Sequence, residues 1–254
     1  MSEKHYDINY LQNSRRLLLN LKERSYVLFK DVTQGTMVDL GCGAGKDVIE
    51  LAKQNGPGVK VTGVDHDPVM IEQGKTDSKD IDNVSFILSE AFPLPFEDNS
   101  LTGLRTERVI QHLKAPEQVI GEVHRILAPG SPFVIIETDW HSLAFFTEFI
   151  DIEKKINAYL TDVKVNNGFA SRKLTSYLKK QSFNNIKAEI HPIVVSTLQE
   201  ANDYFWIEKM VKEALEKGYI TEKEYTDFYT ALQTADENGY FAASINMIVA
   251  WATK

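Results

Sequence analysis

A glycine-rich turn between an expected strand and an expected helix most limits what this chain can fold into. Residues 36–40 form a short run typical of a β-strand, the turn GCGAG occupies residues 41–45, and apolar residues then recur at helical spacing over residues 48–52. Glycine permits positive φ and close approach of a ligand to the main chain, and the amides at a helix N-terminus attract anions. This order predicts an α/β unit with a ligand at the turn.

Strands and helices continue to alternate along the chain. This alternation predicts an α/β fold whose sheet has seven strands, is mostly parallel, ends on an antiparallel last strand and carries helices on both faces. The further strands are expected at residues 59–64, 84–88, 101–106, 133–137, 186–195 and 240–250, and helices at 14–30, from 68, at 116–127 and at 171–181.

Two helical stretches interrupt the alternation. One covers residues 142–160, and the other lies between the last two strands, where Thr197 with Glu200 and Thr221 with Glu224 match capping boxes. We therefore expect a single domain over residues 1–254, with an N-terminal helical segment (1–34) and two helical lid insertions (141–170 and 197–238).

Composition excludes several function classes. The formal net charge of −8 disfavours a nucleic-acid substrate, because phosphate binding depends on clustered basic residues. The single cysteine, Cys42, allows no intrachain disulfide and fits a reducing compartment. No secretory leader and no apolar run long enough to span a bilayer is recognisable. We expect a cytoplasmic protein with no membrane partner, no nucleic-acid partner and no metal, and a homodimer stays open.

Two common glycine-rich motifs do not fit the turn. A phosphate-binding P-loop needs glycine five positions before its Gly-Lys pair and Ser or Thr after it, where this chain has Leu40 and Asp47. A dinucleotide fingerprint needs a third glycine where this chain has Lys46. The turn alone therefore leaves the ligand open.

An acid at the end of the second expected strand narrows the choice of ligand for the glycine turn. Asp65 lies 20 residues after Gly45, the spacing at which an acid accepts the ribose hydroxyls of an adenosine moiety. The alternative is that residues 65–68 only cap the next helix, for which Asp67 is well placed.

Four motifs in order resemble those of class I S-adenosylmethionine-dependent methyltransferases, of the small-molecule type that includes quinone-ring methyltransferases. Residues 38–45 (VDLGCGAG) and 63–65 (GVD) match the first two motifs, residues 89–96 (SEAFPLPF) the third, and residues 125–130 (RILAPG) the fourth. The resemblance is close over residues 35–140 and implies S-adenosylmethionine as the cofactor. It says little about the substrate.

The resemblance also implies residue roles. The glycine turn meets the methionine end of the cofactor, Asp65 holds the ribose, and Glu90 receives the adenine amino group, although the family more often has Asp there. For His66 and Met70, ordinary packing at a helix start is the alternative to packing on adenine and ribose. The implied cofactor residues are Asp39, Gly41, Cys42, Gly43, Gly45, Asp65, His66, Met70, Glu90, Ala91 and Phe92.

Residues after the fourth and fifth strands are candidates for the chemistry, because ligands of open α/β sheets bind at the carboxyl ends of the strands. Arg108 or the backbone of Val109 is expected to contact the methionine portion of the cofactor. His112 and His141 are the candidate bases, and a helix-capping or packing role is the alternative for His112. Arg105 and Glu107 are expected to pair with each other or with their neighbours.

Aromatic residues suggest a substrate pocket. Trp140 offers a flat wall, and Tyr204 and Trp206 lie in the second helical insertion. Near the N-terminus, Tyr10 and Arg16 are expected to fold over the cofactor and substrate. A core, surface-helix or dimer-face role is the alternative for these residues.

The expected function is transfer of a methyl group from S-adenosylmethionine to an O, N or C atom of a small, apolar or aromatic metabolite. An RNA or protein methyltransferase is disfavoured by the acidic charge and by the lack of an Asn-Pro-Pro-Tyr motif after the fourth strand. Two more candidate functions are those of a non-catalytic cofactor-binding protein and of a nicotinamide-dependent oxidoreductase.

Overall fold

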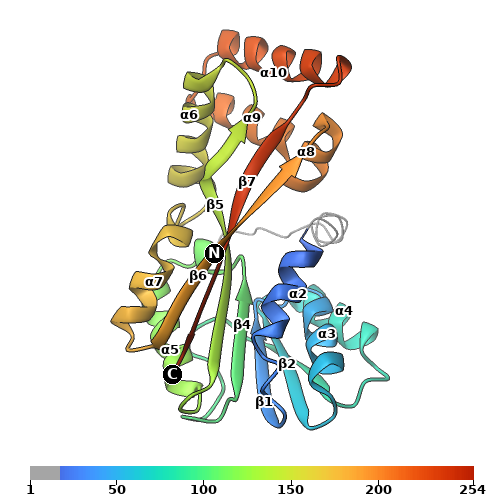
Figure 1. Ribbon diagram of the computed structural model, residues 1–254, viewed down its shortest axis with the longest axis vertical. Coiled ribbons are helices and arrows are strands. Elements are labelled where there is room, and N and C mark those ends of the chain that lie inside the picture. The colour runs from blue at the N-terminus through green and yellow to red at the C-terminus, as the bar shows by residue number, and fades with distance from the viewer. Residues whose placement is uncertain (1–17) are drawn as a thin grey trace.

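Two lobes lie one above the other along the long axis of the molecule (Figure 1). The computed structural model describes residues 18–254. The lower lobe contains the sheet with helices beside it, and the upper lobe contains the ends of three long strands surrounded by α6, α8, α9 and α10 (Figure 1). Among residues 18–254, no helix is both long and apolar enough to cross a bilayer.

The sheet has seven strands in the order β3-β2-β1-β4-β5-β7-β6. β7 is antiparallel to both β5 and β6, whereas the other neighbouring pairs are parallel. The predicted fold class is therefore confirmed, with the last strand as the antiparallel one. The strands are β1 (Gly35–Leu40), β2 (Val59–Asp65), β3 (Val84–Leu88), β4 (Gly103–Glu107), β5 (Pro132–Phe145), β6 (Asn184–Val195) and β7 (Ala243–Thr253).

Helices pack on both faces of the sheet. One apolar cluster joins β1 and β2 to α2 and α3 and continues into the upper lobe, and a second cluster joins the sheet to α5 and α7. The two clusters account for the burial of both faces of the central strands, as a parallel sheet requires. The helices of the lower lobe are α2 (Leu19–Val27), α3 (Lys46–Asn55), α4 (Pro68–Asp77), η1 (Ile110–His112), α5 (Pro116–Ile126) and α7 (Ala170–Lys180).

The fifth strand is longer than the sequence predicts. The sequence pattern predicts a helix from Ser142, but β5 runs through Phe145 and the helix begins at Ile150. The end of β5 is held by pairing with β7, where Ala144 lies opposite Ser244, after an irregularity that follows Asp139. Trp140 and His141 therefore lie within β5 and not after it, and the helical prediction over residues 142–149 is wrong.

The second helical insertion lies between β6 and β7, as expected. Thr221 and Glu224 form the complete capping box at the start of α10, and the Thr197 side chain accepts a hydrogen bond at the start of α8. β7 begins three residues later than predicted. The helices of the upper lobe and its connection are α6 (Ile150–Tyr159), η2 (Leu160–Lys164), α8 (Leu198–Phe205), α9 (Ile207–Glu216) and α10 (Glu222–Glu237), and their action as a lid stays a prediction.

Candidate functional site

The glycine turn joins β1 to α3 and uses glycine for two separate reasons. Gly41, Gly43 and Gly45 have φ of 73°, 51° and 73°, a region that side chains disfavour. A Cβ added to Gly41 would lie 2.2 Å from the Cγ2 of Val109, and one added to Gly45 would lie 2.3 Å from the Phe86 ring. The turn therefore needs glycine both for its conformation and for close packing.

The backbone amides of this turn are mostly used inside the fold. The N–H groups of Gly41 and Cys42 donate to the Val64 carbonyl at 2.7 and 3.1 Å, and Gly45 N–H donates to the Cys42 carbonyl at 3.0 Å. Gly43 N–H donates to the Asp65 carboxylate at 2.8 Å. These four N–H groups are therefore engaged within the fold. The expectation that amides face the ligand concerns those at the start of α3, and it stays a prediction.

Asp65 ends β2 beside the turn. Its Oδ2 accepts from Gly43, and its Oδ1 accepts from Asp67 N–H at 3.0 Å. The capping of α4 falls to Asp67, whose Oδ1 accepts from Val69 N–H at 2.8 Å. Capping of α4 therefore does not account for Asp65, whose carboxylate lies against Gly43 of the glycine turn.

Exposed apolar side chains lie beside Asp65. Leu88 is its partner in the β2–β3 register and is 55% exposed, and Val69 in the first turn of α4 is 62% exposed. Phe92, expected at the adenine, is also exposed, whereas Met70 is buried. An acid flanked by apolar surface matches the chemistry of a nucleoside, whose sugar has hydroxyls and whose base is flat and largely apolar. Val69 and Leu88 were not predicted.

A buried cluster of charges lies next to the turn on β1, β4, α2 and α3. The Arg105 guanidinium, 1% exposed, donates to Asp39 at 3.2 Å, to Asp47 at 3.4 Å and to Glu107 at 2.5 Å. The Lys22 ammonium contacts Asp47 and Glu107, each at 2.6 Å. The predicted pairing of Arg105 with Glu107 and its neighbours is confirmed, and the network ties α2 to the sheet.

The cluster sets the charge of its carboxyl groups. Burial raises the pKa of Asp39 to about 7, against the opposing effect of Arg105. Burial also works to raise the pKa of Glu107, but Lys22 and Arg105 outweigh it and hold that pKa at about 2. Asp39 is thus the least firmly ionised acid of this cluster, and its contact with the cofactor stays a prediction.

The segment after β4 returns to the glycine turn. Arg108 has φ of 56°, and its backbone N–H donates to the Ile136 carbonyl at 2.8 Å. This conformation directs the chain back over β1, where Val109 packs against Gly41. The structure therefore brings Val109 to the place expected for the methionine end of the cofactor, and Arg108 lies beside it.

His112 and Trp140 are linked through a residue that the sequence analysis missed. The Trp140 indole N–H donates to Gln111 Oε1 at 2.6 Å, and Gln111 Nε2 lies 3.1 Å from His112 Nε2. Gln111 is 3% exposed. The sequence feature that could have identified Gln111 is its position next to the candidate base His112, shortly after a central strand.

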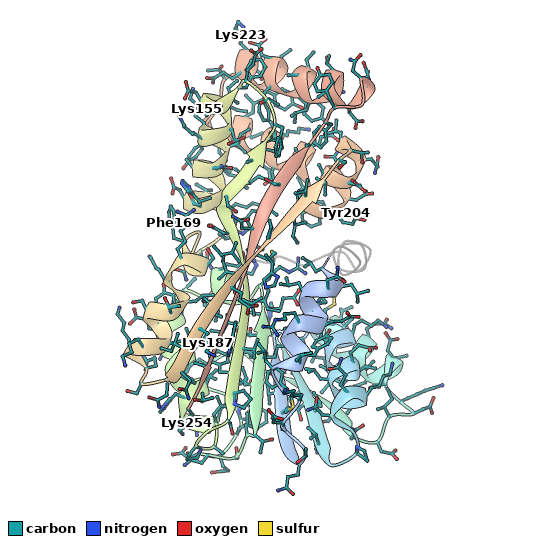
Figure 2. All side chains as sticks on the ribbon, viewed as in Figure 1. Lys155, Phe169, Lys187, Tyr204, Lys223 and Lys254 are labelled. Atoms are coloured by element: carbon teal, nitrogen blue, oxygen red, sulfur yellow. The ribbon has the colours of Figure 1, made fainter. Side chains whose placement is uncertain are left out.

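The other predicted residues lie in several separate segments of the chain. His141 is exposed, with its ring centroid 5.7 Å from that of Phe169. Figure 2 shows Phe169 and Tyr204 on opposite sides of the junction between the lobes. Trp206 joins α8 to α9 at φ of 56°, with Lys209 over its ring at 4.6 Å. His66 and Glu90 are exposed and Ala91 is partly buried. Tyr10 and Arg16 lie outside the described residues.

Glu137 on β5 is a completely buried carboxyl group under η1. Its Oε1 accepts from Ile110 N–H at 2.6 Å, and its Oε2 has no hydrogen-bond partner among residues 18–254. Burial raises the pKa of Glu137 to about 8, which the bond from Ile110 only partly offsets. At neutral pH this carboxyl group is therefore mostly protonated.

Replacing Glu137 by glutamine should change how stability depends on pH. The unfolded chain releases the proton near the ordinary pKa of 4.5, whereas the folded chain keeps it to about pH 8. Glu137 therefore favours the fold fully below about pH 4.5, and this stabilisation is lost as pH rises to about 8. Denaturant unfolding should show that Glu137→Gln gains stability relative to the parent over this range. A difference that stays constant with pH would contradict this account.

Comparison with known proteins identifies related sequences and folds. A family model described as a methyltransferase domain matches residues 31–182, more than half of the chain. An uncharacterized 37.1 kDa protein in transposon TN4556 of Streptomyces fradiae is 32% identical over 185 residues, covering 72% of this chain and 53% of the relative. A demethylmenaquinone methyltransferase of Staphylococcus aureus (strain JH9) is 36% identical over 122 residues, covering 46% of this chain and 49% of the relative.

The chain spans about half the length of these curated relatives. Among solved structures, phosphoethanolamine N-methyltransferase 2 of Haemonchus contortus, in complex with phosphomonomethylethanolamine and S-adenosylhomocysteine, matches with a TM-score of 0.62 and 17% identity. The match covers 99% of this chain and 59% of that one. At this identity the match shows that the two proteins share a fold.

Proposed function

The chain belongs to the methyltransferase-domain family, and from this premise we propose that it transfers a methyl group from S-adenosylmethionine to a small molecule. The observation that carries the proposal is the Asp65 carboxylate, held against the glycine turn and flanked by the exposed side chains of Val69 and Leu88. The acceptor atom is O, N or C, in an apolar or aromatic molecule.

The residues at the turn fit this cofactor. Asp65 would receive the ribose hydroxyls, the exposed side chains of Leu88, Val69 and Phe92 would cover the base, and Glu90 would receive its amino group. The backbone of the glycine turn, beside Val109, would hold the methionine end. When bound, S-adenosylmethionine supplies an electrophilic methyl group on a positively charged sulfur.

The protein's own contribution is to orient the acceptor and exclude water. Trp140 supplies a flat wall, and Tyr204 and Trp206 come from the helices of the upper lobe, which act as a lid. The net charge of −8 favours a small molecule over nucleic acid as substrate. We propose a cytoplasmic location, because a single cysteine fits a reducing compartment. The demethylmenaquinone methyltransferase and the phosphoethanolamine methyltransferase among the similar proteins are named for small molecules.

Transfer of a labelled methyl group tests the proposal. The full chain is incubated with methyl-labelled S-adenosylmethionine in three separate reactions. The first contains a panel of quinones, phenols and amines, the second total RNA, and the third a protein extract. We expect label in an organic-extractable small molecule. Label in RNA or protein alone would overturn the proposed substrate class, and cofactor binding with no transfer to any fraction would favour a non-catalytic binding protein.

Removal of a histidine tests how the acceptor is activated. If one of His112 and His141 removes a proton, its replacement by alanine should lower single-turnover rate by roughly 10²–10⁴-fold, and affinity for S-adenosylmethionine should stay nearly constant. We expect at most one of the two variants to show this loss. Full activity of both variants would contradict a histidine base. The rate enhancement would then come from holding the acceptor close to the methyl group.

A further inference from the structure

The turn after β4, residues 108–113, contains η1 and is held in two halves by different parts of the chain. We call it the η1 turn. Its first half is bonded to β5, where the buried Glu137 accepts from Ile110 N–H at 2.6 Å. The residue before Ile110 is Val109, which packs against Gly41 of the glycine turn. The sheet therefore fixes the half of the η1 turn that lies against the glycine turn.

The second half of the η1 turn is bonded to two asparagines that precede α7. Asn167 N–H donates to the Gln111 carbonyl at 2.8 Å, and its side-chain amide donates to the Leu113 carbonyl at 2.6 Å. The Asn166 amide donates to the His112 carbonyl at 2.7 Å. Three successive carbonyls at the end of a helical turn, which have no partner in a following turn, thus each receive an N–H. The side-chain bond of Asn167 is partly buried and that of Asn166 is exposed, so Asn167 contributes more.

The two asparagines belong to a short segment, residues 165–168, that connects η2 to the start of α7. We call it the asparagine segment. It packs closely on η2, because a Cβ added to Gly168 would lie 2.1 Å from the Thr161 carbonyl oxygen. Figure 2 shows the next residue, Phe169, at the junction between the lobes. The asparagine segment therefore contacts η2 on one side and the second half of the η1 turn on the other.

We propose that Asn167 is a positioning residue that sets where His112 lies relative to the acceptor of the methyl group. This inference rests on the proposed methyl transfer, in which His112 acts on the acceptor. The first half of the η1 turn keeps Val109 at the glycine turn through its bonds to β5, whereas the second half carries His112 and depends on Asn167. Loss of the Asn167 amide therefore disturbs the handling of the acceptor and leaves cofactor binding intact.

Amide hydrogen exchange of the full chain, followed by NMR, tests the role of Asn167 without any need for activity. The N–H groups of His112 and Leu113 are bonded within the η1 turn, to the carbonyls of Val109 and Ile110 at 2.8 and 3.2 Å. We expect Asn167→Ala to speed exchange of these two amides about three- to tenfold, the value of one neutral hydrogen bond. Unchanged exchange at both amides would overturn the proposal.

Two further variants separate the hydrogen bond from a general loss of stability. Asn167→Asp keeps the size of the side chain but places an acceptor against the Leu113 carbonyl, so it should speed exchange at least as much as Asn167→Ala. Asn83 is the matched control, because its amide donates to the carbonyls of Gly56 and Val59 at 3.1 and 3.0 Å, at the end of α3 far from the glycine turn. Asn83→Ala should lower the free energy of unfolding and leave the η1 turn unchanged. Exchange like that of the parent in Asn167→Asp would contradict the role of the amide.

Kinetics then separate this inference from the proposed function. Asn167→Ala should lower turnover roughly 10-fold, since misplacement of a group by about 1 Å can cost about 10²-fold, and its affinity for S-adenosylmethionine, measured by calorimetry, should equal that of the parent. If the parent transfers no methyl group, the proposed function fails, and the exchange data still show whether Asn167 holds the η1 turn. If the parent is active and Asn167→Ala turns over as fast as Asn83→Ala, the positioning role is wrong. It is also wrong if Asn167→Ala loses cofactor affinity in proportion to turnover.

Discussion

Replacement of Gly43 by valine is expected to abolish binding of S-adenosylmethionine while leaving the sheet folded. Gly43 has φ of 51°, a conformation that a β-branched residue strongly disfavours. Its N–H also donates to Asp65 at 2.8 Å, so a shift of this backbone would displace the predicted ribose acceptor. Calorimetric titration with S-adenosylmethionine measures the effect.

A second glycine provides the control for backbone strain. Gly239 has φ of 73°, and an added Cβ there would have no atom within 4 Å. Gly239→Val therefore carries a similar conformational cost after α10, away from the glycine turn. We expect it to lose stability but to bind S-adenosylmethionine like the parent. Normal binding by Gly43→Val would show that the turn does not contact the cofactor.

Replacement of Asp65 by alanine is expected to weaken S-adenosylmethionine binding by about 10²–10⁴-fold. Two hydrogen bonds to a charged acceptor contribute about 1.5–3 kcal/mol each, which corresponds to this range. Asp65→Asn should lie between the alanine variant and the parent, because the amide keeps one acceptor oxygen and the shape of the side chain. Calorimetry on all three proteins gives the series.

Asp67 provides the matched control for Asp65. It lies two residues away and caps α4 through its bond from Val69 N–H. Asp67→Ala should cost about 0.5–2 kcal/mol of stability, the usual value of an N-cap, with little change in cofactor affinity. If Asp67→Ala weakened binding as much as Asp65→Ala, the acids would act by shaping the loop and the ribose assignment would be wrong.

The glycine turn and the position of Asp65 beside it were predictable because both depend on nearby sequence. A strand, a tight turn and a helix start set the spacing between them, and the same motifs led to the family that the methyltransferase-domain model confirms. The capping box of Thr221 with Glu224 was predictable for the same reason.

The length of β5 was not predictable from local pattern. Ala144 and Phe145 are strand because they pair with Ser244 and Ala243 of β7, about a hundred positions further along the chain. A window of neighbouring residues carries no information about that partner.

Side-chain contacts at the site could not be predicted from the sequence either. Nothing in the sequence near Gln111 indicates that Trp140 of β5 donates a hydrogen bond to it. At the start of α4, Val69 faces solvent and Met70 faces the core, a difference of one position that depends on the phase of the helix. Both outcomes follow from packing between segments distant in sequence.

Titration of the purified full chain with S-adenosylmethionine, S-adenosylhomocysteine and NAD, measured by calorimetry, tests the central claim most directly. The claim is that the glycine turn and Asp65 form an S-adenosylmethionine site. We expect one S-adenosylmethionine to bind per chain, S-adenosylhomocysteine to compete with it, and NAD to give no binding heat. Binding of NAD with no response to S-adenosylmethionine, or no binding of any of the three, would contradict the account.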